Sequence, residues 1–209
     1  DNGECISGSD YPCGDTLCRE ESGGMCCENG FAGPNCSKCV RFVYESGIKT
    51  PDGLTWNTAF STVQEAVDSA NDAILIESNG IDSCEIWIAQ GKYEVPATIK
   101  IYSDISIIGG FEALGEKRVN DPSVTVLDGS ANKMDNIIDA SGASNVTLMS
   151  LTFYGNTNQG TDDNYAGALY ISNAAGFVVN SVIFDTNRAV GESADNGYEG
   201  RGGAVAVIE

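Results

Sequence analysis

A repeated pattern of apolar positions organises the second half of the chain. Residues 145–156 (NVTLMSLTFYGN) and 176–187 (GFVVNSVIFDTN) match at a constant offset of 31 residues. The matched apolar pairs are Val146 with Phe177, Leu148 with Val179, Leu151 with Val182, and Phe153 with Phe184. Within each copy, apolar residues alternate, break, and alternate again on a shifted register. This pattern predicts a strand, a turn and a second strand.

The same offset extends beyond these two segments. It aligns Ile138 with Leu169, and a further unit begins at Val205, 36 residues after Leu169. Periods of this length built from short strands are typical of a solenoid, in which each coil buries its inward row against the next coil. Strands stacked about 4.8 Å apart would place like residues over one another. The pattern therefore predicts an all-β fold, a right-handed parallel β-helix over residues 85–209.

Two short motifs mark the turns of the predicted coils. F-x-x-N occurs at matched places of the two copies, at Phe153 and Asn156 and at Phe184 and Asn187, and G-G-A-V occurs at Gly202 and Gly203. The Phe is expected to fill the inside of a coil, and the Asn to bond backbone groups at the turn and stack on its counterpart one coil away. Glycines let the chain pass a corner where a larger Cβ would collide. We expect these Asn side chains to be structural rather than ligand-binding.

The pattern becomes helical between the cysteine-rich amino terminus and the first predicted strand at Glu85. Apolar residues at spacings of three and four share one face, and Ser61 with Gln64 makes a capping box; the apolar residues are Phe60, Val63, Val67 and Ala70. Residues 40–84 are thus expected to be a linker and a cap, with a helix over about 60–70 covering the open strand edges of the first coil. The alternative is a partner-binding helix, which the narrow apolar face disfavours.

Residues 1–39 hold seven of the eight cysteines and few aliphatic residues, so cross-links are expected to hold them. The motif C-x-x-G-F-x-G-x-x-C, from Cys27 to Cys36, resembles the closing loop of an epidermal-growth-factor-like domain, although Cys26 and Cys27 are adjacent where that family has one residue between them. The resemblance implies three disulfides within this module: Cys5–Cys18, Cys13–Cys26 and Cys27–Cys36.

In that arrangement Cys39 is left over, and Cys84 is the remaining cysteine of the chain. We predict that these two pair and fasten the module to the first coil. The alternative is a cysteine-rich metal site, which the absence of His and of two spaced CxxC motifs disfavours.

Composition and charge restrict the partners and the compartment. Lys and Arg total 11 against 30 Asp and Glu, a net charge of −19, which repels nucleic acids and anionic membranes and leaves cations and neutral glycans open. The cysteines indicate an oxidising compartment. No stretch approaches the roughly 20 apolar residues of a membrane helix. We expect a secreted, extracellular chain that begins at Asp1 after removal of its signal, without membrane insertion.

Catalysis would need groups that this chain supplies sparsely. The absence of His excludes triads and metal sites that depend on it. Hydrolysis of a glycan would need carboxylates converging from successive coils, and two polar loops hold candidates: Asp162 and Asp163 in the first, and Glu192, Asp195 and Glu199 in the second. Arg188 and Arg201 are the basic residues near them. We expect solvated loops and no catalytic residue.

The same acidic loops offer oxygen ligands for Ca²⁺, with Asp162 and Asp163 as the candidates. No D-x-D-x-D-G loop accompanies them, so no cofactor is expected beyond this candidate ion. Two sequons permit N-glycosylation, at Asn35 and Asn145. Asn145 is expected at an accessible corner of a coil, whereas Asn35 lies inside a disulfide loop. The alternative for both is an unmodified turn asparagine.

The repeated F-x-x-N and G-G-A motifs resemble the passenger repeats of the polymorphic outer membrane protein family, and the segment from WIAQGKY to TVLDG resembles other secreted surface β-helix proteins. An epidermal-growth-factor-like module before a β-helix also resembles flagellar-hair proteins of heterokont algae. These resemblances imply adhesion or surface coating.

Residue Glu209 directly follows a core-type strand, so we expect the β-helix to continue or another subunit to stack there. The leading hypothesis is a non-enzymatic structural or adhesive protein that self-associates into a surface fibre. The alternatives are a carbohydrate-active lyase or hydrolase, and a glycan-binding module using aromatic side chains such as Tyr154, Tyr165 and Tyr198.

Overall fold

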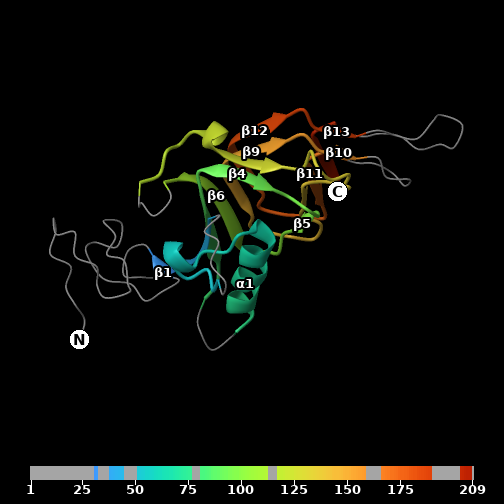
Figure 1. The fold of residues 1–209 in the computed structure, drawn as a ribbon. Helices are drawn as coiled ribbons and strands as arrows, with labels where there is room; N and C mark the ends of the chain where they lie inside the picture. The colour runs from blue at the N-terminus through green and yellow to red at the C-terminus, as the bar shows by residue number, and fades with distance from the viewer. Residues whose placement is uncertain are drawn as a thin grey trace, which may run out of the picture.

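The computed structural model describes residues 31–32, 38–44, 51–76, 81–112, 117–158, 166–189 and 203–208, and in them the chain is mostly β, with parallel sheets and one α-helix (Figure 1). The helix is α1 (Val63–Leu75), and two short 3₁₀ helices are η3 (Trp56–Thr58) and η5 (Pro122–Val124). The strands are β1 (Phe31–Ala32), β2 (Lys38–Val43), β3 (Cys84–Ala89), β4 (Gly91–Glu94), β5 (Ile99–Lys100), β6 (Ile105–Phe111), β7 (Thr125–Asp128), β8 (Ile138–Asp139), β9 (Thr147–Tyr154), β10 (Thr157–Asn158), β11 (Leu169–Ser172), β12 (Val178–Asp185), β13 (Arg188–Ala189) and β14 (Val205–Ile208).

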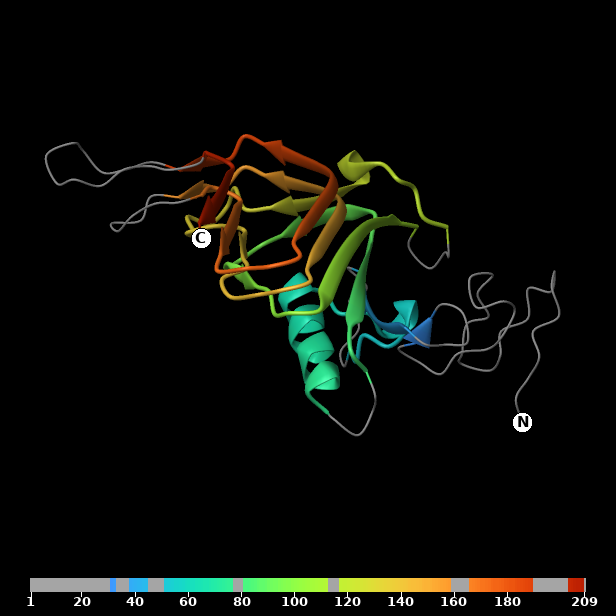
Figure 2. The same ribbon diagram turned by 180° about the vertical axis from the view of Figure 1, so that it is seen from behind.

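The strands from β3 onward follow one another as triplets, β3–β4–β5, β6–β7–β8, β9–β10–β11 and β12–β13–β14. The first strands pair in parallel in the order β3–β6–β9–β12, and the third strands in the order β5–β8–β11–β14. Among the middle strands, β4 pairs with β7, β7 with the second half of β9, and β10 with β13. Each triplet therefore lies beside the next in the chain, and we call this stack of triplets the ladder (Figure 2).

The register predicted from the sequence repeat is confirmed. Leu148 pairs with Val179, Leu151 with Val182, and Phe153 with Phe184. The third strands also pair as expected, Ile138 with Leu169 and Leu169 with Val205. Because like residues occupy matched positions, apolar side chains form continuous columns through the ladder. Three such columns are Ile86–Ile107–Leu148–Val179, Tyr93–Leu127–Phe153–Phe184 and Ile99–Ile138–Leu169–Val205.

The repeat is also present in the backbone conformation. Ser150 and Ser181 have positive φ angles of 54° and 52°, and they lie 31 residues apart at the same place in β9 and β12. Asn145 and Gly176 share the left-handed region at the same spacing, before each of these strands. A left-handed residue is costly outside glycine. Its recurrence at matched positions indicates that successive triplets turn the chain in the same way.

Helix α1 lies at the opposite end of the ladder from β12 (Figures 1 and 2). It buries one apolar face against β2, β3 and β5, and the buried residues are Val63, Ala66, Val67, Ala70 and Ala73. The predicted capping box of Ser61 and Gln64 is wrong. Thr62 is the N-cap, and its hydroxyl accepts from the backbone N–H of Glu65, whose carboxylate accepts in turn from the N–H of Thr62. The helix also begins and ends later than the predicted span of 60–70.

Strand β2 precedes the helix, whereas the sequence predicts strands only from Glu85 onward. It pairs in parallel with β3, so that Arg41 lies beside Ile86 and Phe42 beside Trp87. A second buried cluster lies on the face of β2, β3 and β6 opposite the main core, and its aromatic members are Phe42, Trp56, Trp87 and Phe111. The rings of Trp87 and Phe111 stack with centroids 4.5 Å apart. This first part of the sheet is thus buried on both faces.

Candidate functional site

The 31-residue repeat places Asn156 and Asn187 at matched positions on the ladder. Asn156 is fully buried, and its Nδ2 donates to the backbone oxygens of Met134, at 3.1 Å, and Gly167, at 2.6 Å. The Nδ2 of Asn187 donates to the backbone oxygen of Phe153, and the N–H of Asn156 donates to the Oδ1 of Asn187 at 3.1 Å. Both amides are used to tie one triplet to the next. The expected structural role is therefore supported by every bond these side chains make here.

At the G-G-A-V motif the structure differs from the prediction that a side chain would collide there. Gly203 has no atom within 4 Å of the position where a Cβ would lie, so the collision expected at this motif does not occur there. The collision is found at Gly167, in the related A-G-A-L copy, where an added Cβ would lie 2.5 Å from the N of Arg188 and 2.6 Å from the O of Gly203. Gly167 belongs to the triplet β9–β10–β11, which has a triplet on either side, whereas Gly203 belongs to β12–β13–β14, the last triplet that the structure describes. Gly202 lies outside the described residues.

A disulfide joins Cys39 of β2 to Cys84 of β3, the pair predicted from the cysteine left over by the module. The two residues lie directly opposite each other in the parallel pair, with Cα atoms 4.6 Å apart, and both are buried. The remaining pairings of the prediction, Cys5–Cys18, Cys13–Cys26 and Cys27–Cys36, fall outside the described residues.

Arg41 lies beside this disulfide and is mostly buried. Its Nη1 donates to the Sγ of Cys39 at 3.5 Å, and its Nε donates to the hydroxyl of Ser69 on α1 at 2.9 Å. Burial lowers the pKa of Arg41, and the charge of Asp52 acts in the opposite sense. Arg41 occupies the place next to Ile86 at the start of an apolar column, so its hydrogen bonds connect that column to the helix.

Of the two sequons, Asn145 lies on an exposed turn before β9 and Asn35 lies outside the described residues. The Nδ2 of Asn145 donates to a carboxylate oxygen of Asp104 at 2.9 Å. The side chain is accessible at a corner, as the sequence predicts.

The acidic loops that supply the candidate Ca²⁺ ligands and carboxylates fall outside the described residues. These residues are Asp162, Asp163, Glu192, Asp195 and Glu199, together with Arg201, Tyr165 and Tyr198. In the part of the chain that the structure covers, no group of three or more His, Cys, Asp or Glu side chains could hold a metal ion. Arg188 is exposed on β13, and its backbone N–H donates to the oxygen of Asn156.

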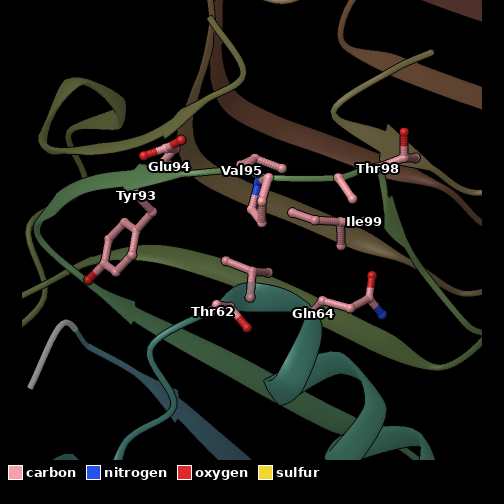
Figure 3. Close-up of a pocket in the computed structure, with 10 residues that line it drawn as sticks. Thr62, Gln64, Tyr93, Glu94, Val95, Thr98 and Ile99 are labelled. Carbon is pink, nitrogen blue, oxygen red and sulfur yellow. The ribbon is translucent and has the colours of Figure 1, made fainter. Parts of the chain in front are cut away.

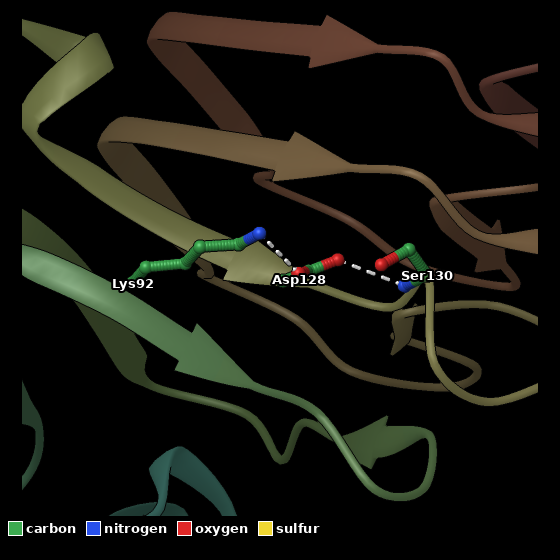
Figure 4. Close-up of polar contacts among 3 residues, drawn as sticks. All are labelled: Lys92, Asp128 and Ser130. Atoms are coloured by element: carbon green, nitrogen blue, oxygen red, sulfur yellow. Dashed lines mark hydrogen bonds and ion pairs between the residues drawn. The ribbon is translucent and has the colours of Figure 1, made fainter.

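A polar contact that the sequence did not predict lies on the outer face of the middle strands (Figure 4). The Nζ of Lys92 lies 2.6 Å from a carboxylate oxygen of Asp128, and the other oxygen accepts from the N–H of Ser130 at 2.8 Å. Burial alone would raise the pKa of Asp128, but the hydrogen bonds from Lys92 and Ser130 and the charge of Lys92 outweigh it, so this pKa lies below its usual value. The ammonium also lies 5.2 Å from the ring centroid of Tyr154. One face of this candidate glycan-binding aromatic is therefore occupied by Lys92.

A pocket of about 230 Å³ lies between the first turn of α1 and residues 93–99 (Figure 3). Its lining is mainly apolar, and three polar side chains around it are already hydrogen-bonded within the protein. Thr62 donates to Glu65, Thr98 donates to the backbone oxygen of Asn136, and Gln64 bonds to Asp68 and to the backbone of Lys100. Of these three side chains, Gln64 bonds the helix to a strand, Thr62 caps the helix, and Thr98 bonds the segment before β8.

Gln64 closes a strand edge at this end of the ladder. Its Oε1 accepts from the N–H of Lys100 at 2.8 Å, and its Nε2 donates toward the oxygen of the same residue at 3.4 Å. Lys100 belongs to β5, the first strand of its sheet, so the side-chain amide takes the place of a neighbouring strand. The outer edge of β2 is likewise bonded to β1 and to the segment around Gly53 and Phe60. At the end of the ladder formed by β2, α1 and β5, which we call the closed end, the outer edges of β2 and β5 are thus bonded, whereas β4 pairs only with β7 among the described strands.

The opposite end consists of β12, β13 and β14, and we call it the open end. Within the described residues, no strand pairs with the outer edge of any of these three. Its apolar side chains are exposed, with Val179 at 44% and Val207 at 68%, alongside Val178 and Ile183.

Comparison with known proteins does not identify this chain: no family model, no curated protein and no solved structure matches it. In the described part of the chain, no helix has the length and apolar character needed to cross a membrane.

Proposed function

We propose that this chain is a non-enzymatic extracellular structural or adhesive protein, a subunit of a surface fibre or filament. In this proposal the triplets are coils of a right-handed parallel β-helix, α1 is its cap, and residues 1–39 form an epidermal-growth-factor-like module. The observation that supports the proposal most is the stacking of like on like. Phe153 lies over Phe184 with ring centroids 5.4 Å apart, and Asn156 is tied to Asn187 at the next corner.

The way in which polar side chains are used also favours a scaffold. A catalytic site needs acid, base or nucleophilic groups aimed at a substrate. In the described residues, Asn156 and Gln64 bond the backbone, and Asp128 is paired with Lys92 and Ser130. These groups bond neighbouring elements of the ladder to one another, as expected for a solenoid with a structural role.

The extracellular assignment is supported by cysteine usage. Seven cysteines lie between Cys5 and Cys39, and the eighth forms a buried disulfide with Cys39. Structural disulfides persist in oxidising compartments. An exposed sequon at Asn145 is also compatible with a secreted glycoprotein.

The proposal is tested by negative-stain electron microscopy of the purified 209-residue chain at rising protein concentration. Ordered fibres or arrays are expected, together with no release of unsaturated or reducing sugars from pectin or alginate. Monomers that cleave either polysaccharide would overturn the proposal and favour the carbohydrate-active alternative. Monomers that bind a glycan without cleaving it would favour the glycan-binding module.

A further inference from the structure

We propose that the disulfide between Cys39 and Cys84 is a link that small thiols can open, in which Arg41 stabilises the reduced state by holding Cys39 as a thiolate. The inference goes beyond the proposed function, because it concerns how β2 is released from β3 and not how the ladder assembles. Its basis is an asymmetry between two buried sulfur atoms on residues that lie directly opposite each other in neighbouring strands.

The two cysteines share the same burial but not the same electrostatic surroundings. Each is 2% exposed, so burial opposes the ionisation of either thiol to a similar degree. The Nη1 of Arg41 donates to the Sγ of Cys39 at 3.5 Å. Among the described residues, no hydrogen bond joins the Sγ of Cys84 to a charged group. A neighbouring arginine favours the thiolate form of a cysteine, so Cys39 is the sulfur that would carry the negative charge.

Arg41 is held in place by bonds that do not involve the disulfide. Its Nε donates to the hydroxyl of Ser69 on α1 at 2.9 Å, and its Nη1 also donates to the backbone oxygen of Val40 at 3.0 Å. These two contacts would keep the guanidinium beside the sulfur after the disulfide is reduced. A buried positive charge is costly without a counter-charge. A thiolate at Cys39 would supply that counter-charge within hydrogen-bonding distance.

The other charged groups near this pair do not reverse the asymmetry. Asp52 acts on Arg41 as a second negative charge, and its carboxylate accepts from the N–H of Leu54. Glu85, next to Cys84 in β3, bonds an indole N–H on the face of the strand opposite the main core. A carboxylate there disfavours a thiolate at Cys84. The acidic residues of α1 are exposed and lie on its solvent side: Glu65, Asp68 and Asp72.

Reduction in this arrangement takes two exchange steps. A thiolate of the reductant attacks the Sγ of Cys84, the sulfur–sulfur bond breaks, and its electron pair leaves with Cys39 beside Arg41. A second thiolate attacks the reductant sulfur of the mixed disulfide and releases Cys84. Two electrons thus pass from two reductant thiols, which become one disulfide, to the two protein sulfurs. The two protons of those thiols go to water, which returns one to Cys84.

Reduction would change how β2 is attached to the ladder. The two strands would remain paired by their backbones over Cys39 to Val43, but the covalent shortcut to Cys84 would be lost. Residues before Cys39 would then be joined to β3 through residues 40–83 alone. Both sulfur atoms are buried, so a thiol reaches them when the strands open locally. Access therefore sets the rate of reduction, whereas Arg41 affects its equilibrium.

The direction of attack is tested by partial reduction of the 209-residue chain with glutathione. The products are trapped with N-ethylmaleimide in acid and mapped by peptide mass spectrometry, which separates Cys39 and Cys84 from the cysteines of residues 1–36. We expect glutathione on Cys84 and maleimide on Cys39. Glutathione found mainly on Cys39 would overturn the inference, because Cys84 would then be the better leaving group.

The equilibrium with glutathione measures what the charge of Arg41 contributes. Arg41→Gln keeps a side-chain N–H donor without the charge, and it should shift the equilibrium about tenfold toward the disulfide, which lowers the reduction potential by about 30 mV. Arg188→Gln is the matched control, since it removes the same charge from an exposed position on β13. It should leave the equilibrium unchanged. Equal potentials in the unmodified chain and Arg41→Gln would contradict the inference.

A pH profile distinguishes loss of the charge from loss of packing around Arg41. Alkylation of Cys39 in Cys84→Ser should begin at a lower pH than alkylation of Cys84 in Cys39→Ser, because the two thiols are equally buried and differ in their contact with Arg41. The midpoint of such a profile does not depend on access. Arg41→Gln should remove the difference and Arg41→Lys should restore most of it, with circular dichroism verifying that each variant is folded. Identical midpoints for the two thiols would exclude the proposed thiolate at Cys39.

Discussion

The closed and open ends of the ladder are built from the same repeated columns, yet they differ in what each residue contributes. Leu148, in the interior, is fully buried, whereas its column neighbour Val179 at the open end is 44% exposed. At the closed end the corresponding place is held by Arg41, whose hydrogen bonds run to α1. The comparison shows that in a stacked structure the contribution of an apolar residue to stability depends more on whether it has a neighbour on both sides than on which apolar residue it is.

The largest expected effect compares the two phenylalanines of one column. Phe153→Ala should lower the free energy of unfolding by about 3–5 kcal/mol, because the ring is fully buried between neighbours. Phe184→Ala should cost less, about 1–3 kcal/mol, since its ring is only partly buried. Urea denaturation at concentrations where the chain is monomeric measures both. Equal losses would show that the two rows are equally covered, against the description of an open end.

A smaller effect is expected at the paired glycines. Gly167→Ala should destabilise by about 1–3 kcal/mol, because the added methyl meets the backbone of Arg188 and Gly203. Gly203→Ala, with open space around it, should change stability by no more than about 0.5 kcal/mol. Thermal unfolding followed by circular dichroism distinguishes the two. Equal losses of stability in the two variants would contradict the difference in packing at these glycines.

Removing the edge cover should have a modest effect on stability and a local effect on dynamics. Gln64→Ala frees the N–H and oxygen of Lys100, at a cost of about 0.5–1.5 kcal/mol because water can replace part of the bonding. The amide hydrogen of Lys100 should exchange faster with solvent, as measured by NMR. Gln64→Glu is the matched control, since it keeps the acceptor for that N–H and should preserve most of the protection. Unchanged exchange in Gln64→Ala would mean that the helix, not this side chain, protects β5.

The smallest effect concerns pH. The pKa of Asp128 lies below its ordinary value of 3.8, so its ionised form adds stability above that value, and this contribution is lost as the pH falls through the lowered pKa of the folded state. Lys92→Met should raise the pKa of Asp128 toward its ordinary value, as followed by carboxyl NMR titration. Asp121, whose pKa is lowered by hydrogen bonds from Ser123, is an internal control and should shift little. A Lys92→Met protein with an unshifted Asp128 would leave Ser130 as the sole cause.

The register of the ladder could be predicted from the sequence because the sequence contains two copies of the same pattern of apolar residues. An offset of 31 residues relates Phe153 to Phe184 and Ile138 to Leu169, and the same offset governs the strand pairing. An apolar residue facing inward has to be repeated wherever the chain returns to the same place. Periodicity therefore carried information about contacts between residues far apart in the chain.

Features that occur once were harder to predict. Strand β2 has no second copy, so its short alternation of Cys39, Arg41 and Val43 gave no repeat to align. The second aromatic cluster could have been found from β3, since EIWIA is apolar almost continuously, as in a strand buried on both faces. Gln64 gave no such signal, because its partner Lys100 is brought near it only by the tertiary fold.

The disulfide at the closed end has a mechanical consequence. Cys39 and Cys84 are separated by 45 residues in sequence and join neighbouring strands. A pull applied along the chain would cross from one cysteine to the other through the sulfur atoms, and α1, which lies in the bypassed segment, would carry no tension. Up to about 150 Å of extended polypeptide would remain unavailable for stretching while the bond is intact, so a chain under tension would keep α1 folded until the disulfide is reduced.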